Sequence, residues 1–171
     1  MSKTTSRKPS PRNVKGASSG SDIRTSESTA HLLRLGQKSI LSPAQIESPR
    51  TILESFANPR PERDYQIKFI FPEFTSVCPV TGQPDFATIT VDYIPYLRCV
   101  EMKSLKLYFL AYRNKGIFYE GVVNTILDDL VAVVNPRRMT VIGEFAVRGG
   151  TAGIVTATHH RDPAGKRRKG T

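Results

Sequence analysis

The spacing of apolar side chains predicts two neighbouring strands where the organised part of the chain begins. Residues 66–71 are rich in aromatic and β-branched side chains and stop at Pro72, so we expect a first strand there. Residues 86–94 alternate apolar and polar side chains, which is typical of a strand with one buried face. The connection, residues 74–85, contains two prolines and a glycine and is expected to be a loop. The two runs with this connection favour an antiparallel pair.

Helical spacing replaces this alternation in the next part of the chain. Residues 105–112 place large apolar side chains on one face, and the Asn-Lys-Gly sequence that follows is a typical helix end. Residues 120–135 carry a longer apolar stripe, and a proline directly after Asn135 stops it. The pattern therefore predicts two amphipathic helices in succession.

Two further strands complete the pattern. Residues 139–147 and 153–158 have strand-like sequences, and the Arg-Gly-Gly-Thr sequence at 148–151 predicts a turn between them. The order strand, strand, helix, helix, strand, strand predicts an α+β domain, in which two helices cover one face of a four-stranded antiparallel sheet. Such a sheet leaves edge strands exposed, and these are often sealed by oligomerisation.

The chain of 171 residues is long enough for one domain, which we place at residues 52–160. Residues 1–30 and 161–171 are basic and poor in large apolar side chains, so both are expected to be disordered tails. Residues 31–51 are expected to be an irregular lead-in, because they mix a short apolar patch with two prolines.

The formal net charge of +10 lies mostly in the two tails, which could bind RNA without sequence specificity. A solubilising role is favoured, because no aromatic side chains are interleaved with the basic ones. No stretch reaches the roughly 18 apolar residues of a membrane span. The N-terminus lacks the apolar run of a secretory signal, so a cytoplasmic protein with reduced thiols is expected.

Cys78 is the first candidate for chemistry, because it lies in the loop between the first two predicted strands. A thiolate attacks electrophilic carbon, and Asp85 could donate or relay protons if the loop folds back. From the residues alone, an inert thiol remains an alternative reading of Cys78. Cys99 lies in an apolar stretch and is expected in the core. These two cysteines form no CxxC pair, so no metal site is expected.

Charged residues at the start of each predicted helix are the second set of candidates. Lys103 and Lys106 lie where a helix N-terminus offers N–H donors, which suits a phosphorylated cofactor. The alternative is a solvated charged face capped by Ser104. Glu120 is favourable against the helix dipole, but a carboxylate also recognises the paired N–H donors of a guanine-like edge. No GxGxxG, P-loop or HExxH sequence is present, which excludes a Rossmann dehydrogenase.

Taken together, these segments resemble the NADPH-dependent 7-cyano-7-deazaguanine reductases, which are tunnelling-fold enzymes of queuosine biosynthesis, a tRNA modification pathway. Residues 76–87, SVCPVTGQPDFA, resemble the loop that carries their nucleophile. Residues 101–108, EMKSLKLY, look like the signature that separates them from the related GTP cyclohydrolase I enzymes. The resemblance runs from about residue 54 to residue 160, and this length resembles the short single-domain form of the family. Further segments that contribute to the resemblance are Tyr112-Arg113-Asn114, Glu120, Leu127-Asp128-Asp129-Leu130 and Arg148-Gly149-Gly150.

The resemblance implies that Cys78 attacks the nitrile carbon to form a covalent thioimide and that Asp85 donates the proton. Two hydride transfers from two NADPH molecules would then give the aminomethyl product, and no metal is needed for this chemistry. The implied deazaguanine-binding residues are Val100, Glu101, Met102, Tyr119 and Glu120, and the implied NADPH-binding residues are Lys103, Ser104 and Lys106.

Two positions depart from the family pattern. Tyr119 stands where the family usually has histidine, and Met102 stands where serine or leucine is more usual. Tyrosine can stack or donate a hydrogen bond but cannot hold a cation, which leaves acid–base use of that position open.

The resemblance also implies a homo-oligomeric ring, a pentamer or decamer, with sites at subunit interfaces and no requirement for nucleic acid. Three alternatives stay open. A tunnelling-fold amidine-forming enzyme would act on a nitrile in tRNA without NADPH. A cyclohydrolase-like hydrolase would need a Cys/His zinc site, and no histidine lies between His31 and His159. An RNA-binding accessory protein would use the basic tails.

Overall fold

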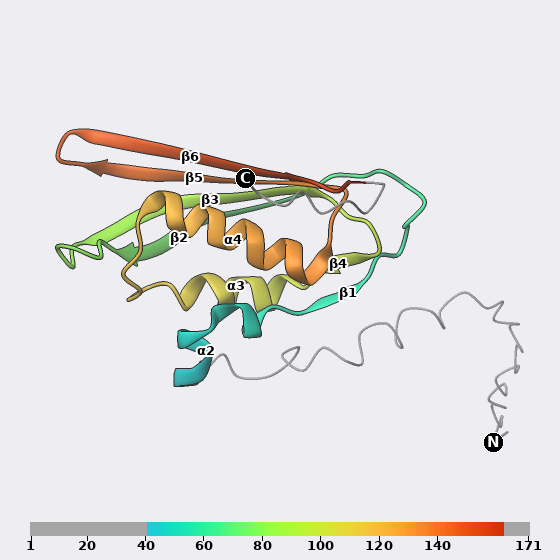
Figure 1. The fold of residues 1–171 in the computed structure, drawn as a ribbon, viewed down its shortest axis with the longest axis horizontal. Coiled ribbons are helices and arrows are strands. Elements are labelled where there is room, and N and C mark those ends of the chain that lie inside the picture. The colour runs from blue at the N-terminus through green and yellow to red at the C-terminus, as the bar shows by residue number, and fades with distance from the viewer. Residues whose placement is uncertain (1–40, 163–171) are drawn as a thin grey trace, which may run out of the picture.

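The structure is a computed structural model that describes residues 41–162 of the chain. A four-stranded antiparallel sheet in the order β2-β3-β5-β6 is its largest element, and α3 and α4 pack on one face of this sheet (Figure 1). The predicted α+β class is therefore confirmed. In chain order the elements are α2 (Pro43–Glu47), the 3-10 helix η1 (Pro49–Ile52), β1 (Ser55–Ala57), β2 (Ile67–Val77), β3 (Pro84–Ile94), β4 (Arg98–Val100), α3 (Met102–Leu110), α4 (Tyr119–Val134), β5 (Arg138–Arg148) and β6 (Thr151–His160).

Pro72 does not end β2, so the prediction that this strand stops at residue 71 was wrong. β2 continues to Val77, and its pairing register with β3 shifts between Phe71 and Phe74. A proline is tolerated at such an irregularity, and β2 is also an edge strand whose outer side has no pairing partner in the sheet. As a result the loop expected over residues 74–85 is shorter, and Cys78 comes directly after a strand.

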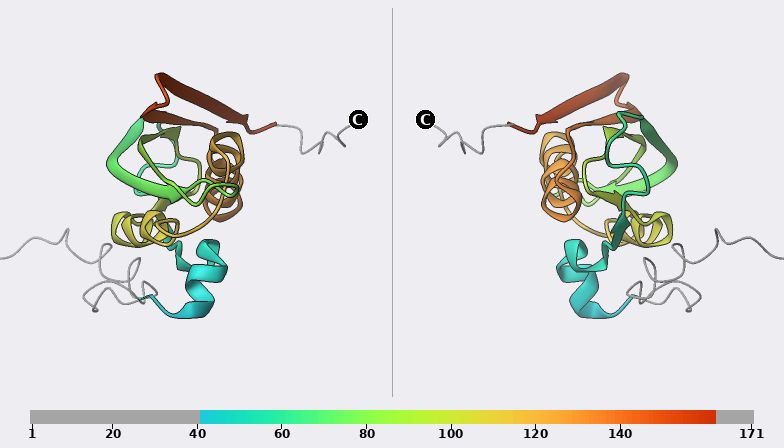
Figure 2. Two further views of the ribbon diagram at one scale, coloured as in Figure 1. Left: turned by 90° about the vertical axis from the view of Figure 1, so that its left-hand side faces the viewer. Right: turned by 90° about the vertical axis from the view of Figure 1, so that its right-hand side faces the viewer.

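The core lies between the sheet and the two helices, which the end-on views in Figure 2 show on the same side of the sheet. Alternate β3 side chains from Ala87 to Tyr93 point into this core, as the two-residue period requires. α4 buries the apolar stripe that the sequence predicts. It lies so close to β5 that a Cβ at Gly143 would be 2.7 Å from Val123 Cγ2.

Two features near the start of the described chain differ from the predicted irregular lead-in. Pro43 and Pro49 are first residues of the short helices α2 and η1, a position where proline's missing N–H costs nothing. Ser42 completes a capping box at the start of α2. β1 and β4 then form a separate two-stranded sheet, which the sequence did not predict.

The predicted tails lie outside the described residues, except for Arg161 and Asp162. Within residues 41–162, no helix has the length and apolar character needed to cross a membrane.

The hairpin between β5 and β6 turns where the sequence predicts. Gly149 and Gly150 have φ angles of 59° and 82°, a left-handed conformation that glycine adopts without strain. This tight turn fixes Arg148 at the end of β5, close to the loop between β2 and β3.

Candidate active site

A tight loop at the tip of the β2–β3 hairpin holds Cys78. The Cys78 amide donates to the Gln83 carbonyl oxygen at 2.8 Å, and the Gly82 amide donates to the Cys78 carbonyl oxygen at 2.9 Å. Gly82 has a φ of 69°, so glycine is favoured at this turn. The thiol is therefore displayed from a closed loop that follows a rigid strand.

The connection between α3 and α4 packs against this loop. The Val77 amide donates to the Lys115 carbonyl oxygen, and the Ile117 amide donates to the Val77 carbonyl oxygen, both at 3.1 Å. Gly116 passes so close that a Cβ there would lie 3.3 Å from Pro79 Cα. These contacts bring the first turn of α4 next to Cys78.

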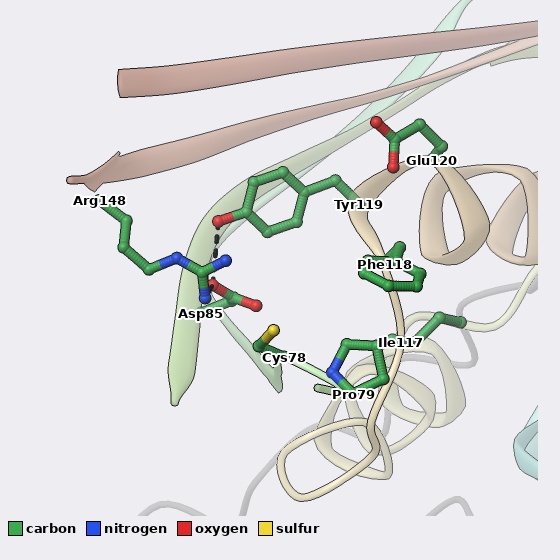
Figure 3. Close-up of a pocket in the computed structure, with 8 residues that line it drawn as sticks. All are labelled: Cys78, Pro79, Asp85, Ile117, Phe118, Tyr119, Glu120 and Arg148. Atoms are coloured by element: carbon green, nitrogen blue, oxygen red, sulfur yellow. Dashed lines mark hydrogen bonds and ion pairs between the residues drawn. The ribbon is translucent and has the colours of Figure 1, made fainter. Parts of the chain in front are cut away.

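A pocket forms where this loop, the start of α4 and the end of β5 meet (Figure 3). It brings together four of the predicted site residues, which come from segments far apart in the sequence. The residues that line the pocket are Cys78, Pro79, Asp85, Ile117, Phe118, Tyr119, Glu120 and Arg148.

Asp85 is the buried acid of this pocket, and two side chains donate to its Oδ1 atom. Arg148 Nη1 lies 2.6 Å from this oxygen, and the Tyr119 hydroxyl lies 2.9 Å from it. The Asp85 side chain is only 3% exposed, so the arginine compensates a carboxylate that has lost most of its water. The loop thus folds back, as proton transfer between Asp85 and the Cys78 site requires.

The Cys78 thiol is buried, yet its surroundings favour the thiolate. Hydrogen bonds from the Thr81 hydroxyl and from the backbone of Thr81 and Val80, with a smaller contribution from Arg148, lower the pKa of Cys78 to about 7. Cys99 is the opposite case, because it is buried in the core and burial raises its pKa. Only Cys78 is suited to act as a nucleophile near neutral pH.

Two proteins are similar in sequence to this chain over most of their own length. A protein from Magnetococcus marinus is 52% identical over 71% of this chain and 94% of its own length, and one from Chlorobium luteolum is 62% identical over 64% of this chain and 94% of its own length. Both carry the name NADPH-dependent 7-cyano-7-deazaguanine reductase. The chain belongs to this reductase family.

Two further comparisons agree with this family. The family model described as QueF-like protein matches residues 84–164. A crystal structure of the apo form of the archaeosine synthase QueF-Like superposes with a TM-score of 0.50 at 25% identity, covering 58% of this chain and 95% of that one. The predicted tunnelling fold of the reductase family is therefore confirmed.

The family signature at the start of α3 lies away from the pocket. The Val100 amide donates to the Tyr93 hydroxyl at 3.0 Å, and Tyr93 lies near the end of β3 that is opposite to Asp85. The strand from Asp85 to Tyr93 rises through eight residue steps, which span about 27 Å. Figure 1 likewise shows α3 starting beside β4, whereas α4 starts at the other end of the sheet. The two predicted groups of site residues therefore do not meet within one chain.

The first turn of α3 is organised by Glu101, which caps its own helix. Its carboxylate accepts from the Lys103 amide at 2.9 Å and from the Ser104 amide at 2.7 Å. The expectation of free N–H donors at this terminus was wrong for these two amides. Ser104 is fully buried, and its hydroxyl donates to the Glu101 carbonyl oxygen and accepts from the Glu54 amide. These two hydrogen bonds give Ser104 a structural role. Met102 and Lys106, in the same helix, are exposed.

Arg148 is a charged residue of this pocket to which sequence reasoning assigned no role. Its Arg-Gly-Gly sequence predicts a turn, but 63 positions separate Arg148 from Asp85, and only the antiparallel pairing of β3 with β5 brings the two ends together. Glu120, a candidate for recognition of a guanine-like edge, lines the pocket with an exposed side chain.

Proposed function

We propose that the chain reduces the nitrile of 7-cyano-7-deazaguanine to an aminomethyl group with NADPH, as an enzyme of queuosine biosynthesis. The observation that carries this proposal is the Cys78 thiol, with its lowered pKa, in one pocket with the buried Asp85 carboxylate. The names of relatives that are 52% and 62% identical over the aligned residues supply the substrate and the reductant.

The first step is addition of the Cys78 thiol across the C≡N bond. The sulfur attacks the nitrile carbon, a carbon–sulfur bond forms, and one π bond of the nitrile breaks. Asp85 takes the thiol proton and passes it to the nitrogen, which gives a neutral thioimide with no proton gained or lost overall. The thioimide carbon accepts a hydride far more readily than a nitrile carbon does.

The chain offers a fitting place for a phosphorylated cofactor at the start of α3. Lys106 is exposed and Lys103 is half-buried, so both ammonium groups can be reached from solvent. These two cationic side chains would form charge-assisted hydrogen bonds with the phosphates of NADPH. Because Glu101 already accepts from two amides of this turn, the lysines rather than the backbone supply the positive charge. NADPH supplies one hydride to carbon in each of two successive reductions.

Recognition of the deazaguanine would use carboxylates from both groups of residues. Glu120 lines the pocket with an exposed carboxylate, which suits the paired N–H donors of a guanine-like edge. Glu101, with the neighbouring Val100 and Met102, would complete the base site from α3. We assign Tyr119, next to Glu120, to the same pocket.

A complete site would therefore need a second copy of the chain, placed so that its α3 approaches the pocket. The outer face of the sheet exposes Ile70, Phe86 and Ile154, which are 62%, 56% and 70% exposed, and a neighbouring subunit would cover part of it. Among residues 41–162, β2 and β6 are the two edge strands of this sheet, and edge strands are sites where another subunit could pair. We therefore propose a homo-oligomeric ring with sites between subunits, in a cytoplasmic enzyme that needs no nucleic acid.

The test combines NADPH oxidation with intact-protein mass spectrometry, using 7-cyano-7-deazaguanine and the wild type, Cys78→Ala and Cys99→Ala. We expect two NADPH consumed per nitrile and a covalent adduct with the wild type. Cys99→Ala should match the wild type if it folds, and Cys78→Ala should show neither signal. An adduct without NADPH oxidation would instead indicate the amidine-forming reaction, and the absence of both signals in the wild type would refute the proposal.

A further inference from the structure

The ring of Tyr119 is fixed on three sides by its neighbours. It stacks on Phe145 with a centroid distance of 3.7 Å and an interplanar angle of 10°. The Arg148 guanidinium carbon lies 5.8 Å from the ring centroid. Gly153, which pairs with Phe145 across β5 and β6, leaves room for the ring, since a Cβ there would be 3.4 Å from Tyr119 Cδ2. The Tyr119 hydroxyl is therefore held in one place, beside Asp85.

This hydroxyl determines which oxygen of Asp85 is available for chemistry. Tyr119 and Arg148 both donate to Oδ1, and within residues 41–162 no side chain donates to Oδ2. Figure 3 shows the second carboxylate oxygen on the side of the Cys78 sulfur. Two donors from two separate elements, α4 and β5, thus fix the carboxylate so that Oδ2 faces the pocket.

We propose that Tyr119 is a positioning residue, which holds Asp85 through a hydrogen bond that persists across the neutral pH range and leaves Oδ2 to transfer the proton during thioimide formation. This inference rests on the proposed function. Without the hydroxyl, only Arg148 would hold Asp85, and the carboxylate could rotate about its Cβ–Cγ bond. The proton would then start from a less favourable position relative to the nitrile nitrogen.

The persistence of this bond follows from the charged and titratable groups that face Tyr119. These groups are Asp85 on β3, Arg148 on β5 and Cys78 on the hairpin loop. Burial, followed by the hydrogen bond to Asp85, raises the pKa of Tyr119 above its ordinary value, so its hydroxyl stays protonated near neutral pH. A histidine at this position would behave differently, because an imidazole changes charge at about pH 6.5.

The test measures the rate of thioimide formation without NADPH, as a function of pH, in the full chain. The variants are Tyr119→Phe, which keeps the ring stack, and Tyr119→His. The matched control is Tyr65→Phe, which removes a hydroxyl that donates to Asn58 Oδ1 at 2.6 Å, away from the residues that line the pocket. Calorimetry in a Cys78→Ala background measures substrate binding separately.

We expect Tyr119→Phe to slow thioimide formation roughly 10- to 100-fold, the usual effect of losing a hydrogen bond to a charged group. Substrate affinity should change by less than about twofold, because the Tyr119 hydroxyl donates to Asp85 and not to the substrate. Tyr119→His should recover part of the rate and add an inflection to its pH profile at about pH 6–8. Tyr65→Phe should follow the wild type.

A wild-type rate for Tyr119→Phe at every pH would overturn the positioning role while leaving the proposed function intact. A rate loss matched by an equal loss of affinity would also overturn it, because Tyr119 would then act in substrate binding. Absence of the adduct in the wild type would refute the proposed function itself, and this inference with it.

Discussion

At the scale of single residues, the reactivity of Cys78 depends on short-range hydrogen bonds and not on exposure. The Cys78 residue is 8% exposed, and the pKa of its thiol is nevertheless lowered to about 7. A lowered pKa means that the thiolate predominates above pH 7, so alkylation by iodoacetamide should reach half its maximal rate near pH 7. Thr81→Val removes the largest stabilising hydrogen bond and should move this midpoint upward, with the greatest loss of rate below the new midpoint.

Thr81→Ser keeps a hydroxyl at the same place and is the matched control for this measurement. Peptide mapping of the alkylated protein would separate Cys78 from Cys99, whose pKa is raised by burial and which should stay unmodified at pH 7. An unchanged midpoint in Thr81→Val would show that another group sets the pKa of Cys78.

Arg148 should matter for stability as well as for chemistry, because it is the cation paired with the buried Asp85. Arg148→Met should destabilise the fold, by less than the loss of a fully buried pair because the arginine side chain is 41% exposed. Urea unfolding would measure this loss. The same substitution in an Asp85→Asn background should cost much less, since no buried carboxylate is then left without its cation. Equal costs in both backgrounds would contradict the ion pair.

The candidate residues could be found in the sequence only where chemistry shows in the local pattern. Cys78 and Asp85 are only seven positions apart in a segment with two prolines and a glycine, so their proximity is a local property of the chain. Arg148 comes next to Asp85 only through the pairing of β3 with β5, which a single sequence does not specify. Ser104 lies in a segment whose sequence resembles an anion site, but its side chain is buried and its hydroxyl donates to the Glu101 carbonyl oxygen.

At the scale of elements, the spacing of apolar residues identified all four strands of the main sheet and both of its helices, because each buries one regular face. Their boundaries depended on contacts that the spacing does not contain. Pro72 is accommodated by a register shift in an edge strand. α3 begins at Met102, three residues before its first predicted position, because Glu101 caps it. The strands β1 and β4 are three residues each, too short to show a period.

Glycines on α4 and on the strand beneath it should respond in opposite directions to the same substitution. Gly143→Ala would place a Cβ 2.7 Å from Val123 Cγ2 and should destabilise the protein by about 1–3 kcal/mol, since the helix must move away from β5. Gly121→Ala meets its nearest atom at 3.4 Å and should stabilise by about 0.5 kcal/mol through helix propensity. Thermal unfolding of the two variants would compare them. Equal shifts would show that α4 does not press on the sheet.

At the scale of the whole molecule, the structure separates the two halves of the proposed site by about 27 Å of β3. The nucleophile and acid lie at one end of the sheet, and the lysines of the family signature lie at the other end. Sequence reasoning named residues of both groups as candidates, but it could not show which of them one chain brings together. That question depends on the folded topology and on how copies assemble.

This separation predicts complementation between two inactive variants. Cys78→Ala lacks the nucleophile, and the double variant Lys103→Ala with Lys106→Ala lacks the cofactor-binding cations. If each site takes the pocket from one subunit and α3 from its neighbour, mixed oligomers contain sites in which both contributions are wild type. Random assembly of equal amounts should restore about a quarter of the wild-type rate of NADPH oxidation, because one subunit pairing in four is intact on both sides.

The two variants would be unfolded and refolded together, with each one refolded alone as its control, and light scattering would confirm that oligomers form. Neither control should regain activity, since all sites in each lack the same group. Failure of the mixture to recover activity, with oligomers of mixed composition present, would mean that the site lies within one chain. The lysines at α3 would then serve another purpose, because the sheet that holds Asp85 at one end and Tyr93 near the other keeps α3 away from its own pocket.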